Sequence, residues 1–355
     1  MPRIGYTVLS IIMGVFSTAA FVLNVTVIVV TLQHRKLRHP LNYALVNLAV
    51  ADLGVTVTGG LLAVVTNGMG YFSLGRIGCV IEGFAVAFFG IAALCTVAVI
   101  AVERFIVVCK PLGFIMFQTR HAVAGVAFSW VWSFIWNTPP LFGWGSYQLE
   151  GVKTSCAPDW YSRDLGNISY ILCYFLLCFA IPFSIIVISY AWLLWALRQV
   201  TRLQMCGGST ARVEVQVTRM VIVMVLAFLL TWLPYAAFAL AVIIDHDLHI
   251  NPIIATIPMY LAKSSTVFNP IIYIFMNKQK WCTSRTVRYW TAGPSLHGGY
   301  LFFVTSFGVL WNLLDCSFRQ STGQIFQKKA TLGLRGSVMA EAHQGFLGAG
   351  EGWDG

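Results

Sequence analysis

Five ionisable side chains lie inside long apolar runs of the sequence, where a charged group is costly and usually serves a function. They are Asp52, Glu82, Glu103, Arg104 and Lys263. Once a buried lysine loses its proton, its amine is a nucleophile that condenses with an aldehyde to form a Schiff base. Lys263 is therefore the residue for which covalent chemistry is most readily expected.

Lys263 lies deep in its apolar run and needs either a partner or a chemical modification. It follows Asn251 by about 18 Å of helix, too far for its side chain to reach water easily. Glu82 is the candidate counter-charge, because it lies near the start of its own run on the same half of the membrane. Position alone leaves two interpretations open: a reactive amine with a carboxylate counterion, or a structural ion pair between two helices.

The composition indicates which elements hold these residues. Of 355 residues, 58% are hydrophobic and only 10% are charged, whereas about 25% are charged in a typical soluble protein. This excludes a soluble domain, and the apolar runs exclude a nucleic-acid-binding protein despite a net charge of +10. Continuous apolar runs of this length predict membrane-spanning helices rather than barrel strands. The runs cover residues 7–32, 41–66, 79–109, 122–142, 167–196, 215–244 and 252–276.

Basic residues set the orientation of the predicted bundle. Clusters such as Arg35, Lys36 and Arg38 recur in the connections on one side, which therefore faces the cytoplasm, with the N-terminus outside. We predict an all-α membrane protein with a seven-transmembrane helix bundle over residues 1–279, in contact with the lipid bilayer. Residues 280–355 are expected to form a largely disordered cytoplasmic tail. Its apolar run Tyr300–Leu314 is marginal in length for a membrane span, and is either interfacial or a translated sequence of no selected structure. Asn167 begins a sequon outside the membrane, where glycosylation stays open.

Motifs on several of these runs resemble the signature positions of rhodopsin-like G-protein-coupled receptors. They are Asn24, Leu48-Ala49-Val50-Ala51-Asp52, Glu103-Arg104-Phe105, Trp232-Leu233-Pro234-Tyr235 and Asn269-Pro270-Ile271-Ile272-Tyr273. A lysine six residues before the Asn-Pro pair resembles the retinal-attachment lysine of opsins, and Glu82 matches the vertebrate opsin counterion. The resemblance covers residues 5–279 and favours a reactive Lys263 over a structural ion pair.

The resemblance to opsins implies a cofactor, 11-cis-retinal, joined to Lys263 as a protonated Schiff base with Glu82 as counterion. Glu150 is either a secondary counterion or an exposed loop carboxylate. The implied chromophore pocket contains Gly90, Phe179, Phe228, Trp232 and Tyr235. Cys79 and Cys156 match the family's disulfide, and the sequence contains no Cys-x-x-Cys pattern that would indicate a metal site.

The same resemblance implies a switch on the cytoplasmic side that controls a heterotrimeric G protein of the inhibitory or transducin class. Arg104 would pair with Glu103 and Glu214, and a polar network would link this lock to the pocket through Asp52, Asn24, Asn269, Pro270 and Tyr273. We therefore expect a light-sensing receptor, not an enzyme, in the cell membrane of photoreceptive cells. The alternatives are a receptor for a diffusible ligand and a retinal photoisomerase.

Two further expectations concern the relatives and the tail. The second outer loop, from Gly143 to Cys156, resembles the vertebrate ancient opsins most and the pinopsins next. After Gln279 the opsin pattern stops, without the paired cysteines and the Ser/Thr-rich segment that opsins carry there. The resemblance therefore leaves arrestin binding in doubt.

Overall fold

The computed structural model describes residues 1–33, 40–109, 118–203, 209–245 and 250–276, without the side chains of residues 40, 108–109, 197–203, 209–216 and 274–276. Residues Met1–Asn277 form one compact unit. The predicted tail over residues 280–355, with its apolar run Tyr300–Leu314, lies outside the described residues.

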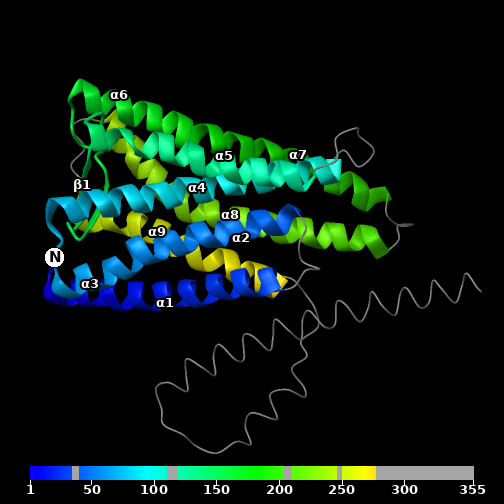
Figure 1. Ribbon diagram of the computed structural model, residues 1–355, viewed down its shortest axis with the longest axis horizontal. Helices are drawn as coiled ribbons and strands as arrows, with labels where there is room; N and C mark the ends of the chain where they lie inside the picture. Colours follow the sequence, from blue (N-terminus) through cyan, green and yellow to red (C-terminus); the bar gives the residue numbers. More distant parts are fainter. Residues whose placement is uncertain (34–39, 110–117, 204–208, 246–249, 277–355) are drawn as a thin grey trace, which may run out of the picture. The chain divides into compact units, whose positions relative to one another are not determined.

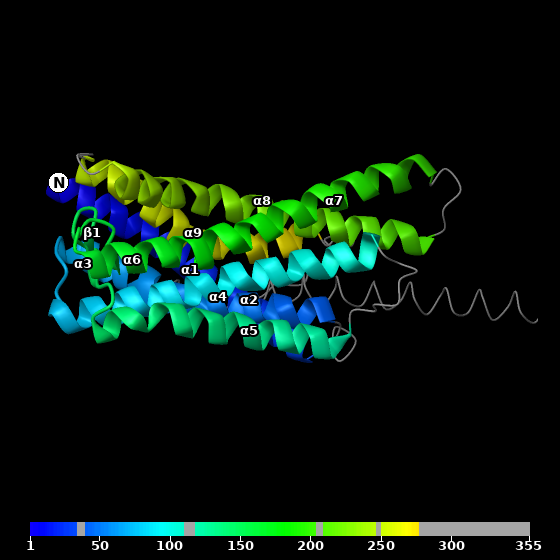
Figure 2. The ribbon, with the colours of Figure 1, turned by 90° about the horizontal axis from the view of Figure 1, so that it is seen from above.

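Seven helical rods run side by side along this unit (Figures 1 and 2). Each of the seven apolar runs forms one rod, as predicted. Two rods contain a wider π-helical segment, which divides the rod into three labelled parts. The rods are α1 (Arg3–Gln33), α2 (Pro40–Val55) with η2 (Thr56–Leu61) and α3 (Leu62–Met69), α4 (Gly75–Cys109), α5 (Thr119–Asn137), α6 (Leu165–Tyr174) with η4 (Phe175–Ala180) and α7 (Ile181–Leu203), α8 (Ser209–Ile244), and α9 (Pro252–Met276).

Length and apolar composition alone would let 5 of these rods cross a membrane, among the described residues. The other two, α5 and α9, carry polar groups within their sequences, such as His121 in α5 and Lys263 and Asn269 in α9. α5 ends at Asn137, whereas the apolar run predicted a helix to residue 142. The short 3₁₀ helix η3 (Pro139–Phe142) replaces that last turn, because prolines supply no backbone N–H for an α-helix.

The π-helical segment η2 brings the second rod close to the residue with the expected chemistry. A Cβ atom at Gly59 would lie 2.6 Å from Cγ2 of Val86 and 3.5 Å from Nζ of Lys263, so only glycine permits this approach. π-Helical turns inside α-helices occur frequently at functional sites. The wide turn at η2 therefore belongs to the wall around Lys263.

A β-hairpin lies across the outer end of the bundle, at the same end as the N-terminus (Figure 1). Strand β1 (Tyr147–Glu150) pairs antiparallel with β2 (Ser155–Pro158), with Glu150 opposite Ser155. Every residue of β2 is buried. The hairpin thus covers the interior between α4 and α9 and supplies side chains to it.

The side chain of Asn167 takes part in the start of α6. It is 3% exposed, and its Nδ2 donates hydrogen bonds to the carbonyl oxygens of Asp159, at 2.8 Å, and Ser162, at 3.0 Å. A glycan on this nitrogen would remove at least one of these bonds and force α6 away from the loop. We expect glycosidase treatment of the purified full chain to leave its gel mobility unchanged, and a shift would contradict this prediction.

Candidate ligand-binding site

Lys263 of α9 and Glu82 of α4 form an ion pair inside the bundle. Nζ of Lys263 donates to Oε1 of Glu82 at 3.0 Å, and the two side chains are only 5% and 0% exposed. Ser155 lies between them: its Oγ donates to Glu82 Oε1 at 2.7 Å and also accepts a hydrogen bond from Lys263. The backbone N–H of Cys156 donates to Glu82 Oε2 at 3.0 Å. Both carboxylate oxygens therefore have partners, which a buried charge requires.

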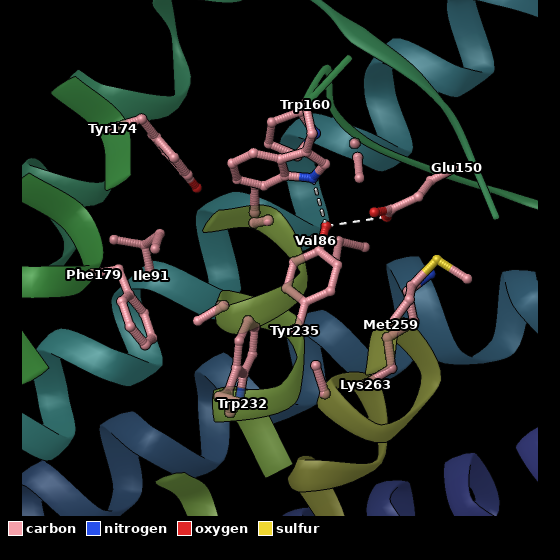
Figure 3. Close-up of a pocket in the computed structure, with 18 of the residues that line it drawn as sticks. Val86, Ile91, Glu150, Trp160, Tyr174, Phe179, Trp232, Tyr235, Met259 and Lys263 are labelled. Atoms are coloured by element: carbon pink, nitrogen blue, oxygen red, sulfur yellow. Dashed lines mark hydrogen bonds between the residues drawn. The ribbon is translucent and has the colours of Figure 1, made fainter. Parts of the chain in front are cut away.

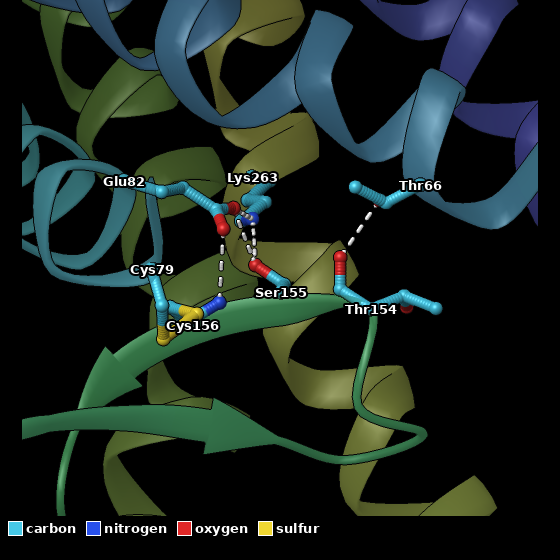
Figure 4. Close-up of a disulfide and its surroundings, with 7 residues drawn as sticks. All are labelled: Thr66, Cys79, Glu82, Thr154, Ser155, Cys156 and Lys263. Atoms are coloured by element: carbon cyan, nitrogen blue, oxygen red, sulfur yellow. Dashed lines mark hydrogen bonds and ion pairs between the residues drawn. A yellow bond between two sulfur atoms is a disulfide. The ribbon is translucent and has the colours of Figure 1, made fainter. Parts of the chain in front are cut away.

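The disulfide between Cys79 and Cys156 lies beside this ion pair (Figure 4). Its Cα atoms are 5.3 Å apart, and it joins α4 to β2. Cys79 lies one helical turn before Glu82, and Cys156 directly follows Ser155. The predicted pairing is confirmed, and the disulfide holds the hairpin where Ser155 and the Cys156 N–H contact the carboxylate.

A second buried polar cluster holds the hairpin turn against α3 and α9. Thr154 Oγ1 donates to Asn67 Oδ1 at 3.1 Å and lies 3.0 Å from the hydroxyl of Tyr260, to which Asn67 Nδ2 donates at 2.5 Å. Thr66 Oγ1 donates to the carbonyl oxygen of Thr154 at 2.7 Å. The Tyr260 ring centroid is 5.8 Å from the Lys263 ammonium. The cluster therefore stabilises the segment that carries Ser155.

An apolar cavity begins at the Lys263 side chain and extends between α4, η4 and α8 (Figure 3). Four of the five predicted pocket residues line it: Gly90, Phe179, Trp232 and Tyr235. A Cβ atom at Gly90 would lie 3.0 Å from the Trp232 ring, so a larger residue would displace that ring. Residues that the sequence did not indicate complete the lining, among them Val86, Ile91, Trp160, Tyr174 and Met259.

Phe228 does not line this cavity, contrary to the expectation. Its side chain is 2% exposed, and its ring is stacked on Trp232 with 5.7 Å between ring centroids. It lies one helical turn before Trp232, so the indole stands between Phe228 and the cavity. Phe228 therefore supports the Trp232 ring from the core instead of contacting a ligand.

Glu150 is buried in the hairpin, so the interpretation as an exposed loop carboxylate is wrong. It is 3% exposed and lines the same cavity as Lys263. Its Oε2 accepts a hydrogen bond of 3.0 Å from the Tyr235 hydroxyl, which itself accepts one of 3.0 Å from Trp160 Nε1 (Figure 3). Oε1 has no hydrogen-bond partner among the described residues. Burial raises the pKa of Glu150 to about 8, although the Tyr235 bond and the Lys263 charge lower it.

The raised pKa of Glu150 predicts that stability falls as pH rises. The unfolded chain loses this proton near the ordinary value of 4.5, and the folded chain holds it to about 8. The contribution to the free energy of unfolding is therefore complete below about pH 4.5 and is lost as pH rises through about 8. We expect Glu150→Gln to have a higher Tm than the unsubstituted chain at about pH 8, with the difference shrinking toward about pH 5. A pH-independent difference would contradict this.

On the cytoplasmic half, the structure brings together most of the predicted switch residues. Asn269 Nδ2 donates to Asp52 Oδ2 at 2.9 Å, and Asn24 Nδ2 donates to the Thr266 carbonyl oxygen at 2.9 Å. Asn24, Asp52, Asn269, Pro270 and Tyr273 line one small internal cavity.

The Arg104 guanidinium forms a bidentate ion pair with the neighbouring Glu103, and both side chains are buried. The side chain of Glu214, the other predicted partner of Arg104, lies outside the described residues. Nε1 of Trp232 donates to Ser265 Oγ at 3.0 Å, so the cavity is in direct contact with the polar face of α9.

The geometry fits an elongated apolar ligand that carries an aldehyde. Among the described residues that line the cavity, Lys263 supplies the only amine, and Glu82 balances its charge. The rest of the lining is mainly aliphatic and aromatic, as expected for a site that binds a hydrocarbon chain. In the part of the chain that the structure describes, no cluster of three or more histidine, cysteine, aspartate or glutamate residues could hold a metal.

Comparisons with known proteins agree with this geometry. Residues 23–273 match the family described as 7 transmembrane receptor (rhodopsin family). The crystal structure of squid rhodopsin aligns with a TM-score of 0.72 at 27% sequence identity, over 85% of this chain and 91% of that chain.

The order of the related sequences by identity differs from the order expected from the second outer loop. Parapinopsin of Ictalurus punctatus is 74% identical over 280 residues, which are 79% of this chain and 81% of that protein. Pinopsin of Columba livia is 51% identical over 278 residues, 78% of this chain and 80% of that protein. Vertebrate ancient opsin of Salmo salar is 43% identical over 275 residues, 78% and 84% of the two chains. The expected order, with vertebrate ancient opsins first, is therefore wrong: one short loop carries less information than the full length.

Proposed function

Since the chain belongs to the rhodopsin family of seven-transmembrane receptors, and to the opsins within it, we propose that Lys263 binds 11-cis-retinal covalently with Glu82 as its counterion. Opsins are light-sensing receptors, not enzymes; they use retinal and act through heterotrimeric G proteins. The observation that carries the proposal is the buried Lys263–Glu82 pair at one end of an apolar cavity. When bound, retinal supplies a light-driven isomerisation that changes the shape of the ligand.

The residues around Lys263 orient the ligand and exclude water. The hairpin covers the outer side, while Phe179 and Trp232 confine the polyene from η4 and α8. Gly90 leaves room for the Trp232 ring on the face that α4 presents. A rigid pocket of this kind makes the change of ligand shape costly unless the helices move, which is how light shifts the receptor population.

Glu82 holds the proton at the nitrogen of the Lys263 linkage. An opposite charge in a medium of low dielectric constant favours the charged form of that nitrogen. Ser155 and the Cys156 N–H orient the carboxylate for this role. Glu150 lines the same cavity and keeps its proton up to about pH 8, so in this proposal it serves as the secondary counterion once that proton has been lost.

The signal passes from Trp232 along α9 to the cytoplasmic switch. Two hydrogen bonds support this route, one from Trp232 to Ser265 and one from Asn269 to Asp52. Glu103 and Arg104 form the lock, with Glu214 as the predicted second partner of Arg104. Opening of the lock admits a G protein of the inhibitory or transducin class in the membrane of a photoreceptive cell.

The experiment that tests this function measures light-dependent nucleotide exchange. The full chain, supplied with 11-cis-retinal in the dark, is mixed in turn with transducin, inhibitory, stimulatory and Gq-class trimers. We expect exchange only after illumination, and only with the first two. Exchange that neither retinal nor illumination changes, in a chain that forms no pigment, would favour a receptor for a diffusible ligand. Photoisomerisation without exchange by any trimer would favour a photoisomerase.

A further inference from the structure

The cavity that begins at Lys263 carries a polar group at its opposite end. Tyr174 of α6 lines the cavity, and its ring extends inward from the side away from the lysine, with the hydroxyl oxygen at the tip (Figure 3). Ile91 and Phe179, which line the same side, are both apolar. None of the proposed steps in light sensing uses the Tyr174 hydroxyl.

The side-chain amide of Asn137 fixes the direction of the Tyr174 hydroxyl. Asn137 is the last residue of α5 and is completely buried, and its Nδ2 donates to the carbonyl oxygen of Ser133 at 2.7 Å. Because a carbonyl oxygen can only accept, the amide nitrogen must face Ser133 and the amide oxygen must face Tyr174. The Tyr174 hydroxyl therefore donates its proton to Asn137 Oδ1, at 3.0 Å.

The Tyr174 oxygen keeps an unused acceptor position. A phenol hydroxyl has one proton to donate and can also accept a hydrogen bond. Its proton is committed to Asn137, and no group among the described residues donates to the oxygen. Trp160, whose ring centroid lies 6.4 Å from that of Tyr174, has an N–H, but this N–H donates to the Tyr235 hydroxyl at 3.0 Å. A donor for the Tyr174 oxygen must therefore come from a ligand or a water molecule in the cavity.

We propose that the cavity prefers a retinal whose ring carries a hydroxyl group, which donates a hydrogen bond to the Tyr174 oxygen; this rests on the proposed linkage of the aldehyde to Lys263. With the aldehyde end held at Lys263, the ring of the ligand lies at the Tyr174 end of the cavity. Among apolar side chains alone, a ring hydroxyl would be buried without a partner, which is costly, and Tyr174 removes that cost. A ring that ends in an ether has no proton to donate and gains nothing.

Competition between two aldehydes tests this preference without any measurement of light sensitivity. The full chain receives, in the dark, an excess of an equal mixture of 11-cis-retinal and its derivative with a hydroxyl on the ring carbon opposite the polyene. Borohydride then fixes the bound ligand, and mass spectrometry of the peptide that contains Lys263 gives the ratio of the two adducts. We expect the hydroxylated adduct to exceed the other by about two- to tenfold, the contribution of one net hydrogen bond. The matching methyl ether should show no such excess over 11-cis-retinal.

Three variants locate the preference at Tyr174. Tyr174→Phe removes the acceptor and keeps the ring, so the excess of the hydroxylated adduct should disappear. Because this change also leaves Asn137 Oδ1 without its donor, Tyr174→Phe combined with Asn137→Leu removes both partners; it should give the same ratio and unfold near the temperature of the unsubstituted chain. Tyr170→Phe is the matched control, since its hydroxyl lies on the same helix, donates to the Trp136 carbonyl oxygen at 2.9 Å and does not line the cavity. It should keep the ratio of the unsubstituted chain.

Three results would overturn the preference and leave the linkage at Lys263 standing. The first is equal amounts of the two adducts in the unsubstituted chain. The second is an excess of the hydroxylated adduct that Tyr174→Phe leaves unchanged, or that Tyr170→Phe abolishes as well, because the preference would then have another origin. The third is an equal excess of the methyl ether, because the added group would then be bound for its size and not for its proton. Absence of any adduct on Lys263 would overturn the linkage itself, and this proposal with it.

Discussion

Replacing Lys263 by alanine should abolish pigment formation with 11-cis-retinal. Among the described residues that line the cavity, no other amine is available for the linkage. The unsubstituted chain should gain a visible absorption band in the dark, and borohydride should fix the chromophore to the peptide that contains Lys263. Lys263→Ala should show neither the band nor the fixed adduct.

This substitution also leaves Glu82 buried without its cation, which costs about 3–5 kcal/mol and could unfold the receptor. The control is therefore Lys263→Met combined with Glu82→Gln, which removes both charges and keeps the volume of the two side chains. This pair should unfold near the temperature of the unsubstituted opsin and still form no pigment. A borohydride-fixed adduct on another residue in either variant would contradict the assignment of Lys263.

Replacing Glu82 by glutamine should move the absorption of the pigment from the visible to the near ultraviolet at neutral pH. The amide occupies the same space but carries no charge to hold the proton on the linkage nitrogen. Lowering the pH should restore the visible band, because an opposite charge at close range shifts such a proton equilibrium by about 1–3 pH units. Absorption spectra recorded in the dark between about pH 5 and 8 measure this shift.

Two variants separate the charge of Glu82 from its hydrogen bonds. Ser155→Ala removes one hydrogen bond to the carboxylate and leaves the charge in place, so its pigment should stay visible at neutral pH. Glu150→Gln should retain a visible dark pigment as well, because Glu82 lies 3.0 Å from the lysine nitrogen. If Glu82→Gln kept the spectrum of the unsubstituted chain and Glu150→Gln lost the visible band, Glu150 and not Glu82 would be the main counterion.

The seven rods and the central pair could be predicted from the sequence because both depend on local or general physics. Apolar length predicts a helix in lipid, since only helices and closed barrels satisfy their backbone hydrogen bonds there and continuous runs of about 20 apolar residues do not fit barrel strands. Lys263 and Glu82 stand out because charge within such runs is rare. The helix that ends at Asn137 was predicted to continue to residue 142 because the apolar run continues through Pro139 and Pro140.

The rest of the site depends on long-range contacts that no local pattern reveals. Ser155 has the composition of any loop serine, and only the pairing of Cys156 with Cys79 places it beside Glu82. Glu150 was ambiguous because burial by a hairpin leaves no mark in the sequence. Phe228 follows the helical spacing of a pocket residue, but the Trp232 indole, held by Ser265, covers it. No particular residue composition marks the two π-helical turns, so the sequence did not predict them.

Formation of the Cys79–Cys156 disulfide is a step that the newly made receptor must complete before its hairpin is fixed over the ion pair. Each cysteine lies next to a contributor to the ion pair, Cys79 one turn before Glu82 and Cys156 directly after Ser155. In the newly made, still reduced chain, nothing covalent holds the loop over the lysine. Oxidation therefore fixes the hairpin over the ion pair, and we expect a chain that stays reduced to release its ligand faster than the oxidised chain, although the 3.0 Å contact between Lys263 and Glu82 does not depend on the bridge.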